Sequence, residues 1–247
     1  LNLPFDVPAN EFLTLESRQL STSRNWAVWI PDYLDRYDPD PLRYYLAATM
    51  PETSDSDFSW QDFVRFNNDE LVATYGNLVH RVLTFTYRNF DGKVPTPGHI
   101  DGETEELFSA CGQLLDEVST NISNCHFRVA LNAAMAIARH ANRYLDVKEP
   151  WRTIKNDKES TATTLWSTIS VINCLKVALY PFLPFSSEKL HAMLGFDYPV
   201  SDVGWSWEPT RDALPPGQGL SSPEPLYSKF DDHLVSEELE RLNQVSS

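Results

Sequence analysis

The stretch FRVALNAAMAIARHANRYL, residues 127–145, carries the pattern that decides the fold. Its apolar side chains recur at alternating intervals of four and three residues, which places them on one face of an α-helix. Alanine is frequent on this face, and small side chains let a neighbouring helix approach closely. The stretch predicts a long helix packed inside a bundle, with a buried stripe made by Phe127, Leu131, Ala134, Ala138, Ala141 and Leu145.

Helical signals continue over most of the chain on both sides of this stretch. Proline at a first turn and apolar spacings of three and four mark further helices. In DPDPLRYYLAATM we expect Asp40 to cap a helix that Pro41 opens, and in PFLPFSSEKLHAMLG we expect a serine cap. The other helices are expected at 31–37, 60–89, 102–119, 121–146, 150–155, 160–180 and 231–245.

Two parts of the chain lack helical periodicity. Residues 1–30 suggest extended and loop structure, and residues 198–228 hold most of the late Pro, Gly and Ser. The sequence therefore predicts a mainly α fold: about five long helices in a bundle, preceded by a small mixed α/β segment.

The charge of the chain is unevenly distributed. The net charge is −15 (20 basic against 35 acidic residues), which is unusual for a protein that binds nucleic acid. Residues 121–156, however, hold six Lys or Arg against two Asp or Glu. A local basic stripe on an acidic body favours specific docking over non-specific phosphate binding.

The sequence gives no indication of a disulfide framework, a metal centre or a membrane span. The three cysteines are widely spaced and form no CxxC pair, so we expect free thiols of a cytoplasmic protein and no metal site. No apolar run reaches the ~18 residues that a bilayer requires, and the N-terminus has no signal-peptide pattern. The chain begins without Met, as if in mid-domain, and we expect it to be part of a longer protein.

Asn77 and Arg81 form the first candidate site. They lie four residues apart on a predicted helix, so their side chains leave the same face, and Arg88 roughly continues that line. Asn and Arg are the side chains that bind base edges with paired hydrogen bonds. The alternative is an ordinary solvated helix face.

Trp151 is the second candidate. It directly follows Pro150 at a predicted helix start, among polar neighbours. It is either a lid on the bundle core or an exposed platform on which an unpaired base stacks.

The polar loop RQLSTSRN, residues 18–25, is the third candidate. Its hydroxyl groups lie between Arg18 and Arg24 and could hold phosphates through side-chain and backbone donors. It has no glycine, so it is not a P-loop, and the alternative is a surface turn.

Five segments resemble motifs of the methionyl-tRNA synthetases, a family of class I aminoacyl-tRNA synthetases. They occur in the order of the family and together cover most of residues 13–195. The first resembles the KMSKS loop, and the others are similar to motifs of the anticodon-binding domain. They are RQLSTSRN (18–25), YDPDPLRYYL (37–46), FVRFNNDELVATYGNLVHR (63–81), ANRYLDVKEPWRTIK (141–155) and LYPFLPFSSEKL (179–190).

The resemblance implies roles for individual residues. Asn77, Arg81 and Trp151 match positions that recognise the CAU anticodon, with the tryptophan stacking near the wobble cytosine. Further tRNA contacts are expected at Arg88, Arg152 and Lys155. The loop that closes over ATP and stabilises charge during adenylate formation corresponds to Gln19, Leu20, Ser21, Thr22 and Ser23.

This loop departs from the family pattern at two positions. Gln19 stands where the first lysine is usual and Thr22 where the second is; the threonine form is familiar in the family and the glutamine is not. Arg18, one position away, is expected to supply the missing charge.

The resemblance also implies what surrounds the chain in a complete enzyme. Residues 1–50 would end the catalytic half and contact the tRNA stem, 51–197 would form the anticodon-binding bundle, and 198–247 would form an arm and a helix that packs back. The HIGH motif and the methionine pocket should lie upstream of Leu1, so we expect this chain alone to bind neither ATP nor Mg²⁺ and to make no methionyl-adenylate.

Two alternatives remain open at this stage. One is a non-catalytic RNA-binding or scaffold protein derived from a synthetase. The other is a sister synthetase for cysteine, valine or isoleucine, against which the combination of Asn77, Arg81 and Trp151 argues.

Overall fold

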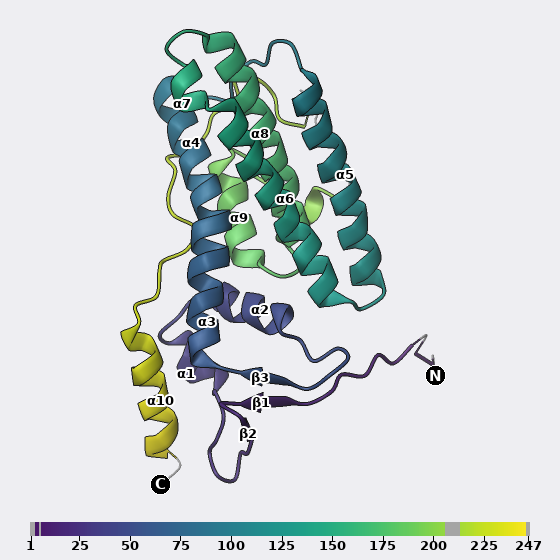
Figure 1. The fold of residues 1–247 in the computed structure, drawn as a ribbon, viewed down its shortest axis with the longest axis vertical. Coiled ribbons are helices and arrows are strands. Elements are labelled where there is room, and N and C mark those ends of the chain that lie inside the picture. The colour runs from purple at the N-terminus through teal and green to yellow at the C-terminus, as the bar shows by residue number, and fades with distance from the viewer. Residues whose placement is uncertain (1–2, 5, 206–212, 246–247) are drawn as a thin grey trace.

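One buried helix organises the bundle that fills the upper part of the molecule (Figure 1). The computed structural model describes residues 3–4, 6–205 and 213–245. In helix α8 every residue from Thr161 to Leu179 is buried. Around it lie the other long helices of the bundle, so the mainly α fold is confirmed. The bundle consists of α4 (Asn77–Asn89), α5 (Gly102–Ser123), α6 (Phe127–Lys148), α8 (Lys158–Leu179) and α9 (Pro184–Met193).

Helix α8 has the length and mean hydropathy of a membrane span, although polar residues interrupt its apolar run. Its most apolar 18-residue window has a mean hydropathy of 1.3 and is wholly buried inside the bundle. Three buried hydroxyl groups on α8 find hydrogen-bond acceptors within the helix: Thr164, Thr168 and Ser170 each donate to the carbonyl four residues earlier. Its burial is that of a core helix.

The alanine stripe of α6 lies in the core of the bundle. Ala134, Ala138 and Ala141 are fully buried, and α6 packs along both α5 and α8. The boundary between α5 and α6 differs from the prediction by several residues. Cys125 adopts a left-handed φ of 57° in a tight turn, so α5 continues to Ser123 and α6 begins only at Phe127.

The two predicted helix caps were both wrong, for a related reason. Helix α2 (Pro39–Ala48) begins after Asp38, and α9 begins after Leu183, with no side-chain cap at either start. Asp40 and Ser186 instead lie inside the first turns of these helices. The buried Asp40 carboxylate accepts hydrogen bonds from the Ser186 N–H at 2.6 Å and from its hydroxyl at 2.5 Å. The two residues therefore bond to each other and link α2 to α9.

The segment predicted as one helix over 60–89 is helical throughout but changes its hydrogen-bond register twice. Helix α3 (Trp60–Phe66) leads into the π-helix η1 (Asn67–Gly76), which leads into α4. The Asn77 N–H bonds to the Val72 carbonyl, five residues back. Gly76 fits this wider turn because an added Cβ would lie 2.9 Å from the Leu71 carbonyl oxygen and 3.3 Å from the Tyr227 ring.

A small sheet and the last helix form a second core at the other end of the molecule (Figure 1). The strand order is β2-β1-β3, with β1–β2 antiparallel and β1–β3 parallel. Helix α10 packs on α3, and Glu238 accepts two hydrogen bonds from Arg36, at 3.1 and 3.0 Å. The elements here are β1 (Leu13–Leu15), β2 (Arg18–Gln19), α1 (Ile30–Leu34), β3 (Ser56–Phe58) and α10 (His233–Val245); the remaining short helices are α7 (Pro150–Thr153) and η2 (Val200–Asp202).

Lys176 is fully buried in the bundle core between α8 and α9. Its Nζ lies 2.6 Å from Asn173 Oδ1 and 2.5 Å from His191 Nδ1, and 4.5 Å from the centroid of the Phe196 ring. Burial lowers the pKa of Lys176 to about 7. Burial and the neighbouring lysine lower the pKa of His191 to about 4.

This lysine makes a pH-dependent contribution to stability that can be measured. Between pH 7 and 10.5 the unfolded chain holds a proton on Lys176 that the folded chain has released, so stability rises with pH across this window. Relative to a Lys176→Met variant, the native chain should gain up to about 1.4 kcal/mol of unfolding free energy per pH unit between pH 7.5 and 9. Denaturant unfolding at each pH measures this difference, and the partly exposed Lys189 of α9 gives a control, Lys189→Met. Parallel pH curves for the native chain and Lys176→Met would contradict the prediction.

Candidate functional site

A cavity of about 410 Å³ opens between α4, the end of α6 and α7. Its walls come from α4, from the junction of α6 and α7, and from α8, so segments far apart in the sequence bring Asn77, Arg81, Arg88 and Trp151 together. The cavity is lined also by His80, Val82, Thr84, Phe85, Leu145, Pro150 and Leu165. Buried apolar side chains and exposed polar ones both line it, which is the usual character of a site for an organic ligand.

The Arg81 guanidinium is held from three sides. Nη2 donates to Asn142 Oδ1 at 3.3 Å, Nη1 lies 4.0 Å from Asp146 Oδ1, and Cζ lies 5.1 Å from the centroid of the Trp151 ring. Cation–π contact with the indole and two acceptors on α6 fix the plane of the group. The sequence did not indicate Asn142 or Asp146 as contacts of Arg81. These two residues lie one helical turn apart on α6.

Several polar atoms around this cavity are buried without a hydrogen-bond partner. They are His80 Nδ1, Arg81 Nε and Thr84 Oγ1, all on α4. A buried polar atom without a partner costs roughly 1–3 kcal/mol. The concentration of such atoms beside one cavity marks a surface that a polar ligand would complete.

The position of Trp151 follows from the way α6 ends. Glu149 adopts a left-handed conformation (φ 42°, ψ 57°), which stops α6, and Pro150 then opens the short helix α7. The indole that follows is 36% exposed at the edge of the cavity, so Trp151 is not a core residue.

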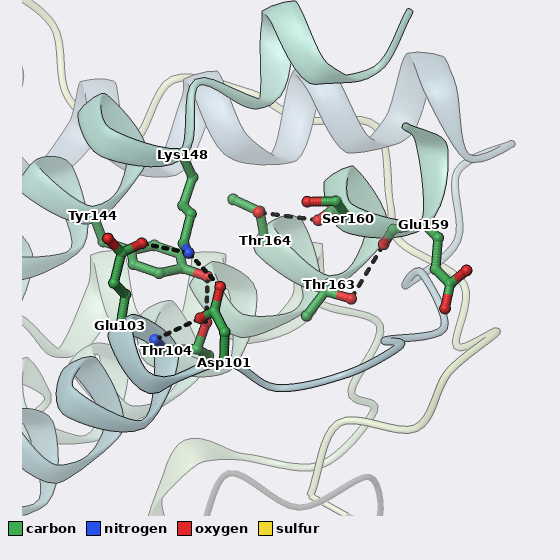
Figure 2. Close-up of polar contacts among 9 residues, drawn as sticks. All are labelled: Asp101, Glu103, Thr104, Tyr144, Lys148, Glu159, Ser160, Thr163 and Thr164. Carbon is green, nitrogen blue, oxygen red and sulfur yellow. Dashed lines mark hydrogen bonds and ion pairs between the residues drawn. The ribbon is translucent and has the colours of Figure 1, made fainter. Parts of the chain in front are cut away.

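A polar cluster anchors the last turn of α6 just before this stop (Figure 2). Lys148 Nζ lies 2.5 Å from Asp101 Oδ2 and 2.5 Å from Glu103 Oε2 at the start of α5. The hydrogen bond from Lys148 lowers the pKa of Asp101 to about 2. Tyr144, one turn earlier on α6, shares a 2.8 Å hydrogen bond with Thr104. The cluster ties α6 to α5 and so supports the turn that carries Trp151.

The other predicted tRNA contacts separate into two groups. Asn77 and Arg88 are exposed and line the cavity. Arg152 and Lys155 do not line it. Arg152 points to solvent beside Glu149, at 2.9 Å, and Lys155 is exposed two residues beyond the end of α7.

The loop of residues 19–23 lies at the opposite end of the molecule from this cavity (Figure 1). It begins at the last residue of β2, Gln19, and closes as a hairpin in which Ser21 and Trp26 exchange backbone hydrogen bonds at 3.0 and 2.8 Å. The Ser21 hydroxyl lies 3.3 Å from that of Ser23 and accepts from Arg24 N–H and Nε–H. Gln19, Leu20 and Thr22 are exposed beside them.

The Arg18 guanidinium lies over the Trp26 ring, with Cζ 4.6 Å from its centroid. Trp26 pairs with Ser21, so the Arg18 guanidinium lies beside the loop. Among the described residues no group of three His, Cys, Asp or Glu is arranged to hold a metal ion, and all three cysteines are free thiols.

Two family descriptions match successive parts of the chain. Residues 1–83 match the family "tRNA synthetases class I (M)", and residues 94–246 match "Anticodon binding domain of methionyl tRNA ligase". The fold is that of a part of a class I aminoacyl-tRNA synthetase that includes its anticodon-binding domain. The chain belongs to the methionyl-tRNA synthetase family, as the five sequence motifs indicated.

Relatives of known identity support this assignment along nearly the whole chain. The chain is 44% identical to methionine–tRNA ligase of Thermomicrobium roseum and 50% identical to that of Dehalococcoides mccartyi (strain BAV1); each alignment covers 98% of this chain, and 45% and 43% of those relatives. It superposes on Mycobacterium tuberculosis methionyl-tRNA synthetase in complex with methionyl-adenylate with a TM-score of 0.79 at 26% identity, over 89% of this chain and 43% of that one. The chain thus spans less than half the length of these relatives.

Proposed function

We propose that this chain binds tRNA(Met) through its CAU anticodon. The observation that carries the proposal is the meeting of Asn77, Arg81 and Trp151 at one cavity, although Trp151 lies 70 residues beyond Arg81 in the sequence. A splayed anticodon base needs an aromatic surface for its ring and fixed donors and acceptors for its edge. The indole supplies the first; the Asn77 amide and the Arg81 guanidinium supply the second.

The charge distribution supports the same role. The acidic body repels phosphate in general, whereas Arg81 and Arg88 at the cavity and Arg152 beside it would attract the backbone of one loop. We infer that Arg152 and Lys155, which lie outside the cavity, contact phosphates and not bases.

We further propose that the chain acts as part of a methionine–tRNA ligase in the cytoplasm. In that enzyme ATP and Mg²⁺ drive the joining of methionine to tRNA, and the catalytic half would pack against the end of this chain that carries residues 18–25. That loop would contact the ATP phosphates through Ser21, Ser23 and the charge of Arg18. In this division residues 1–50 belong with the catalytic half, 51–197 form the anticodon-binding bundle, and 198–247 form an arm and a helix that packs back. The chain alone should form no methionyl-adenylate, which pyrophosphate exchange with methionine and ATP tests directly.

Direct binding of RNA hairpins tests the anticodon assignment. Fluorescence anisotropy of a labelled tRNA(Met) anticodon stem-loop should show binding that weakens about 5- to 150-fold for each substituted base of the CAU triplet. Stem-loops with the same stem and a changed triplet are the matched controls. Equal affinity for all triplets would favour the alternative, a non-catalytic RNA-binding or scaffold protein, and no binding at all would favour a scaffold with a protein partner.

A further inference from the structure

We propose that Asn142 is a positioning residue for anticodon recognition, which ties the Arg81 guanidinium to the π-helix η1. The inference rests on the proposed function of the cavity and extends it to a residue that does not line the cavity. Asn142 lies on α6, one turn before Asp146, and faces the junction between η1 and α4.

The Asn142 side chain joins two different elements with its two ends. Its Nδ2 donates to the Thr74 carbonyl at 3.0 Å, and its Oδ1 accepts from Arg81 Nη2 at 3.3 Å. The partners fix the orientation of the amide, because a carbonyl can only accept and a guanidinium can only donate. The amide is therefore suited to both partners, whereas Ala lacks both groups and Asp lacks the donor.

The Thr74 carbonyl lies close to the place where the backbone register changes. In η1 each N–H bonds five residues back, whereas in α4 it bonds four residues back. The Asn77 N–H still bonds five residues back, to Val72, and the four-residue pattern of α4 follows it. The bond from Asn142 to the Thr74 carbonyl therefore holds α6 against the last turn of η1, three residues before the start of the helix that carries Asn77 and Arg81.

Asn142 constrains Arg81 more firmly than the neighbouring carboxylate does. The Asp146 contact is longer, at 4.0 Å, and the Asp146 side chain is 69% exposed, so solvent screens it. Asn142 is half-buried and contacts the guanidinium from the side of the bundle. Nη2 is bound to Asn142 and the guanidinium lies against the Trp151 ring, so the guanidinium of Arg81 reaches the cavity in one orientation. Less side-chain entropy of Arg81 is therefore lost when a base binds.

A double-mutant cycle tests this role in the full chain. The variants are Asn142→Ala, Arg81→Ala and the pair, and the readout is the ratio of affinities for the CAU stem-loop and a stem-loop with one changed base. This ratio is insensitive to uniform changes in charge or in the amount of folded protein. We expect Asn142→Ala to lower the ratio about tenfold in the native background and less than about twofold in the Arg81→Ala background, since it acts through Arg81.

Two further variants sharpen the result. Asn132→Ala is the matched control. The Asn132 amide lies on the same helix and also accepts a hydrogen bond from an arginine, Arg139, at 2.8 Å, but it lies outside the cavity. The affinity ratio of Asn132→Ala should equal that of the native chain. Asn142→Asp keeps an acceptor for Arg81 and loses the donor to Thr74, so it should lose discrimination as Asn142→Ala does. Full discrimination by Asn142→Asp would show that the tie to the π-helix is unnecessary and would overturn that part of the proposal.

The outcomes separate this inference from the function on which it rests. If Arg81→Ala leaves the ratio unchanged, the proposed anticodon pocket is wrong. If Arg81→Ala lowers the ratio and Asn142→Ala does not, the pocket stands and the positioning role is wrong. An equal loss from Asn142→Ala in both backgrounds would show that Asn142 acts independently of Arg81.

Discussion

Replacing Trp151 with alanine is expected to weaken binding of the CAU stem-loop about 5- to 150-fold. The indole is 36% exposed at the cavity, beside Asn77 and Arg81, for which we propose contacts with base edges. Stacking of a base on such a ring contributes about 1–3 kcal/mol, which corresponds to that range of affinity. Little of this loss should come from unfolding, because Trp151 lies outside both buried cores.

Three measurements make the Trp151 prediction specific. Trp151→Phe keeps an aromatic face and should retain most of the affinity. Trp29→Ala removes a tryptophan of similar exposure at the other end of the molecule, where its Nε1 donates to Asn25, and should leave stem-loop binding unchanged. Thermal unfolding of each variant shows whether the fold is intact. Trp151→Ala binding within about twofold of the native chain would rule out a stacking role.

The bundle could be predicted from local periodicity, but the π-helix could not. The alanine stripe of α6 specifies a helix and its buried face whatever the rest of the chain does. The register of residues 67–76 has no such local signal, because the same side chains would also fit an α-helix. It depends on contacts from elsewhere, such as Tyr227 against Gly76 and Asn142 on Thr74. The misplaced caps have the same origin: Asp40 and Ser186 bond to each other across the fold.

The candidate site was predictable where it depended on spacing within one segment. Asn77 and Arg81 share a helix face, and Pro150 indicated the start of the helical turn that carries Trp151. The contacts of Arg81 with Asn142 and Asp146 depend on where α4 crosses α6, which the chain fixes only after it folds. The same limit explains Arg152 and Lys155: the sequence placed them near Trp151, but α7 turns them out of the cavity.

Replacing Arg81 should affect discrimination between triplets more than overall affinity. A fixed guanidinium contacting a base edge contributes about 1–3 kcal/mol of discrimination, so Arg81→Ala should reduce the preference for CAU about 5- to 150-fold at the base it contacts. Arg81→Lys retains the positive charge but not the planar fork. It should therefore keep the salt dependence of binding while losing most of the preference.

Arg65 provides a matched control for both Arg81 variants. Its guanidinium lies 2.9 Å from Asp62 and 4.7 Å from the Phe66 ring centroid, so it has a carboxylate and an aromatic neighbour as Arg81 has, but it lies on α3 outside the cavity. Arg65→Ala should change neither the preference nor the slope of affinity against salt concentration. Titrations at several salt concentrations, with CAU and changed triplets, separate the two effects. If Arg81→Lys discriminates as well as the native chain, Arg81 acts as a point charge on the RNA backbone and another group must read the base.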